Sequence, residues 1–194
     1  VEMLRFPSER YEAEAVISEV LGGRHTSGVD TLTIMREFDL PEEFSEQVLE
    51  ESRTMAARFD AEDWTKDRKD LTEETVITID PEDARDFDDA ISLGRLDNGH
   101  WRLGVHIADV SHFVRPNTNL DNEAFKRGNS VYLPDRVIPM LPELISNGLA
   151  SLQPNRVRMT LTAEMEFTSE GIPVSTMVVD TAVKSCRRFT YDAV

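Results

Sequence analysis

The stretch Asp80–Asp89 concentrates the side chains of this sequence that are best suited to chemistry. Six of its ten residues are carboxylic acids, and Arg85 is its one base. Carboxylates held close together repel each other, and each is costly to remove from water unless a cation compensates its charge. The simplest compensator is a hard divalent metal, which takes oxygen ligands. Two such metals suit phosphoryl transfer, because one activates a water and the other steadies the leaving oxygen.

Apolar, β-prone sequence lies on both sides of this acidic stretch. Val76–Ile79 precedes it and Ala90–Leu93 follows it, so a strand is expected on each side. Pro81 breaks the first strand, which places Asp80 at a strand end and the remaining acids on a loop. Such a loop could bring three or four carboxylates onto one or two Mg²⁺ ions. A solvated acidic surface loop is the alternative that the residues alone leave open.

Other metal patterns are weaker. An EF-hand is excluded, because counting from Asp80 puts Arg85 where glycine is needed and Ile91 where glutamate is needed. His106 and His112 share strand parity, but no cysteine or third ligand lies at a familiar zinc spacing. Packed or surface histidines are therefore the expectation.

Tyr132 follows the basic pair Lys126 and Arg127 and could serve as a platform on which a nucleic-acid base stacks. A core tyrosine is the alternative. Some basic residues in or near expected strands could contact phosphates, although isolated ones are usually solvated: Arg156, Arg158, Lys184, Arg187 and Arg188.

The composition bounds the class of protein. The chain has 194 residues, 40% of them hydrophobic, and a formal net charge of -16. An acidic chain attracts nucleic acid poorly in bulk, but a local groove or bound metal ions can still hold a substrate. Cys186 is the only cysteine, which fits a reducing compartment. No apolar run of about 18 residues and no signal peptide is visible, so we expect a soluble, cytoplasmic protein without a membrane partner.

Periodicity and turn signals predict an N-terminal group of short strands and a later mixed α and β region. The expected strands are 1–6, 11–21, 31–35, 76–79, 90–93, 101–110, 158–168 and 174–183, with a hairpin turn at 97–99 and an extended segment at 130–133. A helix is expected from Pro41, with an apolar stripe of Phe44, Val48, Leu49, Met55 and Phe59. A charged connection at 61–74, a helix at 120–127 and a helical turn at 139–148 complete the set.

Four blocks in order resemble the ribonuclease II / ribonuclease R family. They are Thr78–Ala90, His106–Val114, Arg127–Pro134 and Ile138–Pro142. The form Ala84-Arg85-Asp86-Phe87-Asp88-Asp89 is closer to ribonuclease R than to ribonuclease II. Residues 14–44 are similar to the end of the second cold-shock domain of that family.

The resemblance implies a mixed α+β chain. Residues 1–40 would be the C-terminal part of an OB-like cold-shock β-barrel, and residues 41–73 a helix and linker. Residues 74–194 would form the N-terminal portion of the mixed α/β RNB catalytic domain. The oligomeric state is not indicated.

The resemblance also implies a function and a site. The family's enzymes are processive, Mg²⁺-dependent 3′-to-5′ exoribonucleases that hydrolyse single-stranded RNA to nucleoside 5′-monophosphates. Asp80 and Asp89 would be metal ligands, Asp86 would support the metal or the terminal nucleotide, and Asp88 would be most critical for chemistry. Tyr132 would stack near the 3′-terminal nucleotide.

The family's catalytic domain continues beyond the part that these residues match, and it supplies an arginine near the scissile phosphate. We therefore expect residues 1–194 alone to be inactive or very weak, and to carry the aspartate cluster without its complementary cations. The alternative is a catalytically inactive RNA-binding or regulatory module of the same fold. The intact set of acids argues against that alternative, since a module without chemistry has no reason to keep four mutually repelling aspartates.

Overall fold

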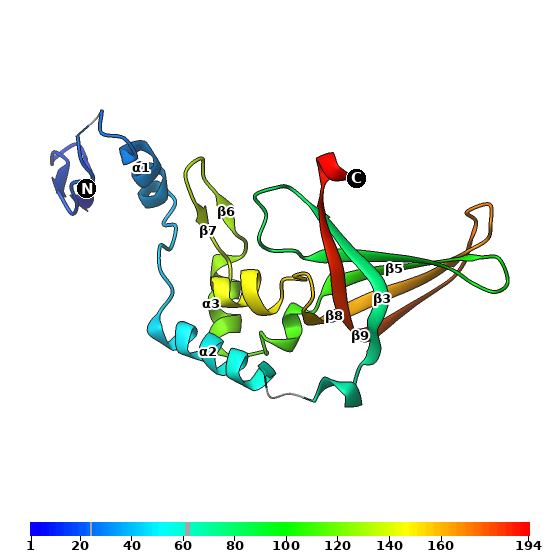
Figure 1. Cartoon of the computed structure of the whole chain (residues 1–194). Helices are drawn as coiled ribbons and strands as arrows, with labels where there is room; N and C mark the ends of the chain where they lie inside the picture. The colour runs from blue at the N-terminus through cyan, green and yellow to red at the C-terminus, as the bar shows by residue number, and fades with distance from the viewer. Residues whose placement is uncertain (24, 61–62) are drawn as a thin grey trace. The chain divides into compact units, whose positions relative to one another are not determined.

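The computed structural model describes residues 1–23, 25–60 and 63–194, which form two compact units. The first unit comprises Val1–Glu43 and Tyr132–Ile138, and the second comprises Phe44–Val131 and Pro139–Val194 (Figure 1). The four aspartates singled out from the sequence all belong to the second unit. No helix in the described ranges is long and apolar enough to cross a membrane.

The first unit contains small strand pairs and one helix. Strands β1 (Glu2–Arg5) and β2 (Glu14–Val16) pair with each other in antiparallel fashion, and β6 (Val131–Tyr132) pairs with β7 (Val137–Ile138). The strand predicted for 1–6 is confirmed, and the one predicted for 11–21 shortens to three residues. The strand predicted for 31–35 is wrong, because helix α1 (Val29–Glu37) occupies these positions.

Local signals explain why α1 is a helix. Gly28 adopts the left-handed conformation with φ of 86° at the N-cap, and the N–H of Leu32 donates to its carbonyl at 3.0 Å. Asp30 in the first turn and Arg36 in the last turn both favour the helix dipole. The β-branched residues between them favour a strand only weakly, so the helix-starting glycine and the end charges prevail.

The helices of the second unit are α2 (Glu46–Asp60) and α3 (Asn119–Arg127). Helix α2 begins at Glu46 rather than at the predicted Pro41, because the Ser45 side chain accepts from the N–H of Val48 at 3.4 Å and starts the helix there. Its predicted stripe packs against the core through Phe44, Val48, Met55 and Phe59. The helix predicted at 120–127 is confirmed as α3; the Thr118 side chain caps it by accepting from the N–H of Asp121, and it ends before Gly128.

The connection predicted for 61–74 is shorter than expected. Residues 61 and 62 lie outside the described part of the chain. Asp63 caps a single turn, Trp64–Lys66, by accepting from the N–H of Thr65. Strand β3 (Lys69–Asp80) begins before the predicted end of the connection, because Lys69, Asp70 and Leu71 pair with β9.

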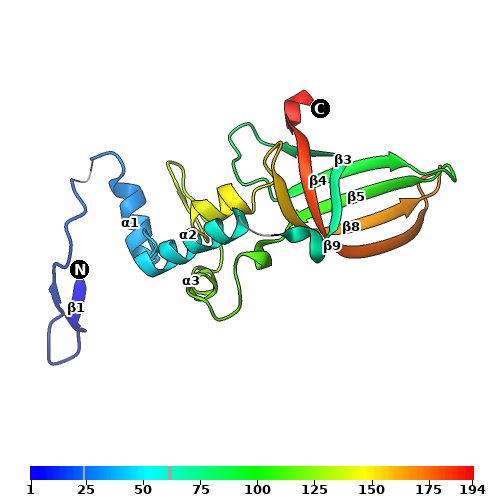
Figure 2. The same cartoon turned by 60° about the horizontal axis from the view of Figure 1, so that its bottom comes forward.

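Five strands of the second unit form a closed barrel in the order β3-β4-β5-β8-β9 (Figures 1 and 2). The other strands are β4 (Asp89–Arg95), β5 (Trp101–Ala108), β8 (Val157–Phe167) and β9 (Pro173–Thr190). Neighbours are antiparallel except β3 and β9, which run parallel. The hairpin turn predicted at 97–99 is confirmed, and Gly99 has φ of 82° there.

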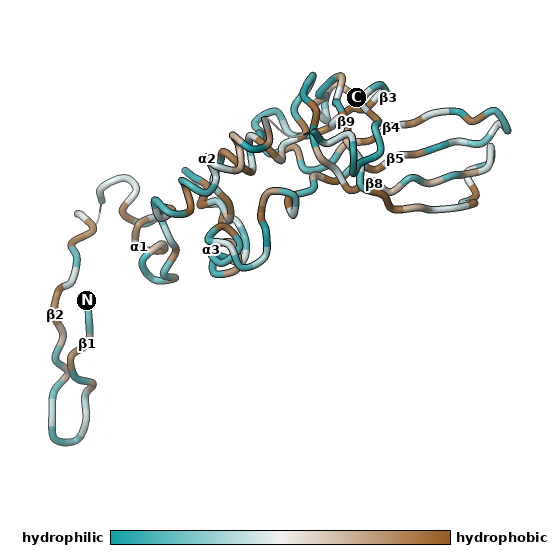
Figure 3. Tube along the Cα trace, turned by 90° about the horizontal axis from the view of Figure 1, so that it is seen from below, coloured by the Kyte–Doolittle hydropathy of each residue, from teal (hydrophilic) through white to brown (hydrophobic). Residues whose placement is uncertain are grey.

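The barrel buries the more polar parity of β5. Gly104, His106 and Ala108 are buried, whereas Ile107 on the apolar parity is 46% exposed. Figure 3 shows the resulting alternation of hydrophilic and hydrophobic residues along the strands. Hydroxyl groups fill the interior, since Thr160, Thr162 and Thr181 have no exposed surface and hydrogen-bond to one another.

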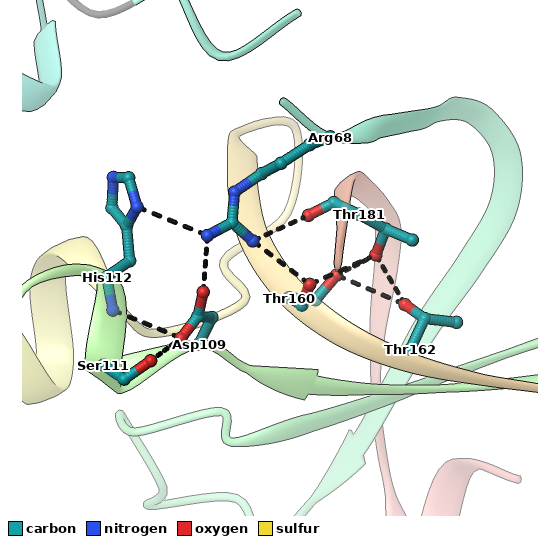
Figure 4. Close-up of polar contacts among 7 residues, drawn as sticks. All are labelled: Arg68, Asp109, Ser111, His112, Thr160, Thr162 and Thr181. Carbon is teal, nitrogen blue, oxygen red and sulfur yellow. Dashed lines mark hydrogen bonds and ion pairs between the residues drawn. The ribbon is translucent and has the colours of Figure 1, made fainter. Parts of the chain in front are cut away.

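A half-buried ion pair joins the residue before β3 to Asp109, which follows β5 (Figure 4). Arg68 pairs with Asp109 and also donates to the carbonyl oxygens of Thr160 and Thr181. Burial alone would raise the pKa of Asp109, but hydrogen bonds from Ser111 and Arg68 and the charge of Arg68 hold it below its ordinary value. The pair therefore fixes where β3 starts relative to β8 and β9.

The apolar core of the second unit lies between the barrel and its helices. It includes Val76 of β3, Phe87 of the acidic stretch and Ile145 of a π-helical segment, Leu144–Leu149. That segment stands where a helical turn was predicted at 139–148. Burial of Phe87 means that the acidic stretch is anchored in the core and is not wholly a surface loop, as one of the two alternatives had it.

His106 gives the barrel interior a testable pH dependence. Its Nδ1 lies 2.9 Å from Thr162 Oγ1 and its Nε2 lies 3.0 Å from Ser92 Oγ. Burial lowers the pKa of His106 to about 4. The unfolded chain therefore binds the proton more readily, and stability is lost as the pH falls from about 6.5 towards 4. We expect His106 to account for about 2 kcal/mol of lost unfolding free energy between pH 7 and pH 5.

Urea unfolding of the wild type and of His106→Gln at several pH values between 7 and 5 checks this expectation. The variant, which has no titrating ring, should lose this part of the pH slope while keeping the contribution of the other histidines. An equal slope in both proteins would show that His106 does not carry the proton linkage.

Candidate active site

The four aspartates lie at the end of one barrel strand, at the start of the next strand and on the loop between them. Asp80 is the last residue of β3 and Asp89 is the first residue of β4, as the positions of the predicted strands required. Asp86 and Asp88 lie on the loop between them, which we call the aspartate loop (81–88). The carbonyl of Asp88 accepts from the N–H of Ala108 at 2.8 Å, which ties the end of the loop to β5.

Asp80 is the most deeply placed of the four. Its residue surface is only 8% exposed, and its Oδ2 atom has no hydrogen-bond partner among the described residues. Burial raises the pKa of Asp80, the nearby Thr78 hydroxyl lowers it, the charges of Asp89 and Asp86 raise it, and the charge of Arg188 lowers it. A buried carboxylate oxygen without a donor is costly, so this atom calls for a cation.

The other three aspartates share the electrostatic environment of Asp80. Removal of water raises the pKa of Asp88, and the negative charges of Asp86, Asp89 and Asp80 raise it further. The negative charges around Asp88 therefore disfavour its ionised form. A cation placed among them would relieve this repulsion, and it would compensate several charges at once.

The residues fit a hard divalent metal, although their side chains are not gathered into a finished site. Within the described ranges, no three acidic, histidine or cysteine side chains lie close enough together to hold a metal ion. The donors available are carboxylate oxygens only, and the Asp80 Oδ2 atom is buried without a partner among the described residues. That donor set matches Mg²⁺ or Mn²⁺ and does not match zinc. Asp80, Asp86, Asp88 and Asp89 are the residues that would hold it.

Ser151 fixes the middle of the aspartate loop. Its hydroxyl donates to the carbonyl of Arg85 at 2.9 Å and accepts from the N–H of Phe87 at 3.1 Å. These two bonds bracket Asp86, and the N–H of Leu152 donates to the carbonyl of Phe87 at 2.9 Å, immediately before Asp88. Ser151 has no exposed surface. The backbone beside both loop aspartates is therefore held by buried hydrogen bonds.

A buried arginine supports Ser151 in turn. Arg158 is 6% exposed, and it donates to the carbonyl of Ser151 and to that of Gly148, each at 2.9 Å. Gly148 belongs to the π-helical segment, whose wider turns leave carbonyls to be satisfied from outside. Arg158, which the sequence suggested as a phosphate contact, is instead engaged within the protein.

The expectation that the complementary cations of the cluster lie outside residues 1–194 stays a prediction, but one arginine of this chain lies beside the cluster. Arg188 of β9 donates to the carbonyls of Pro81 and Glu82, and its charge acts on Asp80. Sequence reasoning did not find this contact, because it depends on the parallel pairing of β3 with β9. Ser151 was missed for a similar reason, since no local pattern marks it.

The other candidates from the sequence have ordinary settings. His106 is packed inside the barrel with both ring nitrogens near hydroxyls, as expected, and His112 lies beside Arg68 and Phe113. Cys186 is a free, exposed thiol. Tyr132 is 70% exposed and lies in the first unit, so its role in stacking stays a prediction.

Comparison with known proteins places both parts of the chain. Residues 68–194 match the RNB domain family, and residues 1–45 match the cold shock domain family. Ribonuclease R of Thermotoga maritima is 46% identical over the whole of this chain, which spans 27% of that protein's length. The chain thus corresponds to about a quarter of this curated relative.

Solved structures agree in fold. Mycoplasma genitalium RNase R in complex with double-stranded RNA has a TM-score of 0.83 and 28% identity, over 98% of this chain and 34% of that one. Yeast Ssd1, described as a pseudonuclease, has a TM-score of 0.76 and 20% identity, over 99% of this chain and 24% of that one. The second likeness concerns the fold alone.

Ser151→Ala tests whether the aspartate loop depends on one hydroxyl. The variant leaves the buried N–H of Phe87 and the carbonyl of Arg85 without their partner, so we expect a loss of about 1–3 kcal/mol in unfolding free energy. Urea denaturation measures it. Ser169→Ala is the matched control, because the Ser169 hydroxyl only reaches the exposed Glu170 side chain at 2.6 Å. Equal losses in the two variants would contradict the assignment.

Proposed function

The chain belongs to the RNB family, and on that premise we propose that it carries the aspartates of a Mg²⁺-dependent exoribonuclease active site. The whole protein would hydrolyse single-stranded RNA from the 3′ end, processively, and release nucleoside 5′-monophosphates. The observation that carries the proposal is the buried Oδ2 of Asp80, which has no partner among the described residues and lies within a set of four interacting carboxylates. Ribonuclease R relatives support the reaction class.

Each aspartate has a proposed role. Asp80 and Asp89, at the two strand ends, would be metal ligands, and Asp86 would support the metal or the terminal nucleotide. Asp88 would be the carboxylate most critical for chemistry. Bound Mg²⁺ supplies positive charge that activates the attacking water and stabilises the leaving oxygen. The protein's part is to hold the carboxylates on a loop whose backbone is fixed at Arg85 and Phe87.

The proposed substrate is RNA, with Tyr132 as a residue that binds it. Mycoplasma genitalium RNase R is described in complex with double-stranded RNA and with ribose-methylated single-stranded RNA, which supports RNA as the substrate class. We propose that Tyr132, 70% exposed, stacks near the 3′-terminal nucleotide. A 2′-hydroxyl would allow the site to distinguish RNA from DNA.

We propose that the chain has three segments. Residues 1–40 would form the C-terminal part of a cold-shock domain, residues 41–73 would be a helix and linker, and residues 74–194 would form the N-terminal portion of the RNB catalytic domain. A cytoplasmic location is proposed from the single, free cysteine, Cys186.

A second candidate is a module that binds RNA without cleaving it. Yeast Ssd1, described as a pseudonuclease, shares this fold, so the fold alone does not decide between the two. The four aspartates favour the enzyme, because a module without chemistry has no use for a cluster of carboxylates whose negative charges raise the pKa of Asp80 and Asp88.

A chimera tests the proposal directly. Residues 1–194 replace the matching segment of the Thermotoga maritima ribonuclease R, to which they are 46% identical. We expect the chimera to shorten a 5′-labelled single-stranded RNA from its 3′ end when Mg²⁺ is present. Asp88→Asn should lower the rate by about 100-fold or more, because the critical carboxylate is removed.

Asp83→Asn is the matched control, since it removes one negative charge from the same loop at an exposed position that has no proposed role. Its rate should stay close to that of the unaltered chimera. A folded chimera that binds RNA and degrades none would favour the non-catalytic module. Equal losses in both variants would show that only the net charge of the loop matters.

We expect residues 1–194 alone to degrade the same RNA very weakly or not at all. The reason is that stabilisation of the transition-state charge would lack the arginine that the family supplies further along the chain. A rate close to that of the chimera, measured at equal protein concentration, would contradict this expectation.

A further inference from the structure

Arg188 occupies a special position beside the aspartate loop. Strands β3 and β9 run parallel, with Thr78 opposite Arg188 and Asp80 opposite Thr190. Side chains two residues apart on a strand point to the same face, so Arg188 and Asp80 belong to the same face of this pair. The pairing thus carries a guanidinium to the end of β3 where the loop begins.

The contacts of Arg188 reach both ends of the loop. Its Nη2 atom donates to the carbonyl of Pro81 and, at 2.8 Å, to that of Glu82, the first two loop residues. Its guanidinium carbon lies 5.0 Å from the centre of the Phe87 ring, just before Asp88. One side chain therefore spans the loop from its entry to its exit.

The chemistry of these contacts favours an arginine. Its Nη2 atom donates to two carbonyls while the guanidinium plane lies over an aromatic ring, whereas a lysine ammonium could donate to the carbonyls but has no plane to cover the ring. The Pro81 carbonyl also accepts from the N–H of Ala84 at 3.1 Å, so Arg188 reinforces the turn with which the loop begins. Ser151 holds the opposite part of the loop at Arg85 and Phe87.

We propose that Arg188 is a positioning residue of the active site: it holds the aspartate loop so that Asp86 and Asp88 face Asp80. It acts through the loop backbone and makes no contact with substrate. This inference rests on the proposed function for its effect on catalysis, but its effect on the loop is independent of that function. Hydrogen exchange tests the effect on the loop, and the rate of RNA hydrolysis tests the effect on catalysis.

The first measurement is hydrogen exchange of the isolated chain without metal or RNA. In Arg188→Gln the amides of Ala84 and Phe87 should exchange about 10-fold faster or more, whereas those of β8 should not change. Arg187→Gln is the matched control, because Arg187 is the neighbouring arginine and its guanidinium lies over the ring of Phe189, 4.6 Å from the ring centre. Unchanged exchange at Ala84 and Phe87 in Arg188→Gln would overturn the proposal.

The second measurement is the rate of RNA hydrolysis by the chimera described above. Arg188→Gln should lower kcat by about 10- to 100-fold, the usual effect of losing a residue that orients ligand groups, with KM for RNA within about 2-fold. A raised KM at unchanged kcat would show a direct contact with RNA and overturn the proposal. Arg187→Gln should match the unaltered chimera.

Arg188→Lys decides between shape and charge. It keeps the positive charge and can donate to both carbonyls from its one nitrogen, but it has no plane to cover Phe87, so its exchange and kcat should lie between those of the unaltered protein and Arg188→Gln. Recovery of kcat by lysine without recovery of the exchange at Ala84 and Phe87 would show that only the charge beside Asp80 matters and would overturn the proposal. If Arg188→Gln does not fold, the lysine variant carries both measurements. An inactive unaltered chimera would defeat the proposed function, and the exchange result would still decide the role of Arg188.

Discussion

The parallel pairing of β3 with β9 is the contact on which the site depends. It closes a barrel whose other neighbouring strands are antiparallel, and it sets Arg188 opposite Thr78 and Thr190 opposite Asp80. Without it, β3 would pair with β4 alone, and the end of β3 at Asp80 would have no neighbour on the β9 side. With it, a carboxylate is buried at a strand end beside a guanidinium, and that burial creates the need for a further cation.

The aspartate loop is shaped by the protein itself. Hydrogen bonds from Ser151, Leu152 and Ala108 fix its backbone on the core side, and Arg188 fixes its entry. These contacts oppose the outward movement of the loop that repulsion between the carboxylates would otherwise cause. This arrangement agrees with the general rule that active-site groups are held in place by a supporting layer of buried contacts.

Local signals predicted the local parts of this structure. The strand before Asp80, the hairpin turn at 97–99 and the helix at 120–127 follow from short patterns, and all three are present. The strand predicted at 31–35 was wrong, because β-branched residues favour a strand only weakly when a glycine starts a helix before them. The polar barrel interior was not predicted either. Periodicity shows that side chains alternate between the two faces of a strand, but not which face lies inside the barrel.

The long-range contacts could not be predicted from one sequence. Ser151 lies 66 residues from Arg85, and Arg188 lies 107 residues from Pro81, so only the closed barrel brings them to the loop. The family resemblance identified the four aspartates through their motif, but it left their supporting residues unnamed. What the structure adds is therefore the layer that holds the aspartates, together with a cation within the chain.

The most direct measurement is an anomalous difference map from crystals of this chain soaked in Mn²⁺, which replaces Mg²⁺ at oxygen sites and scatters anomalously. The account predicts a peak in contact with Asp80 and at least one of Asp86, Asp88 and Asp89, and no such peak in crystals of Asp80→Asn. Ordered crystals that bind Mn²⁺ only elsewhere, or not at all at millimolar concentration, would contradict it.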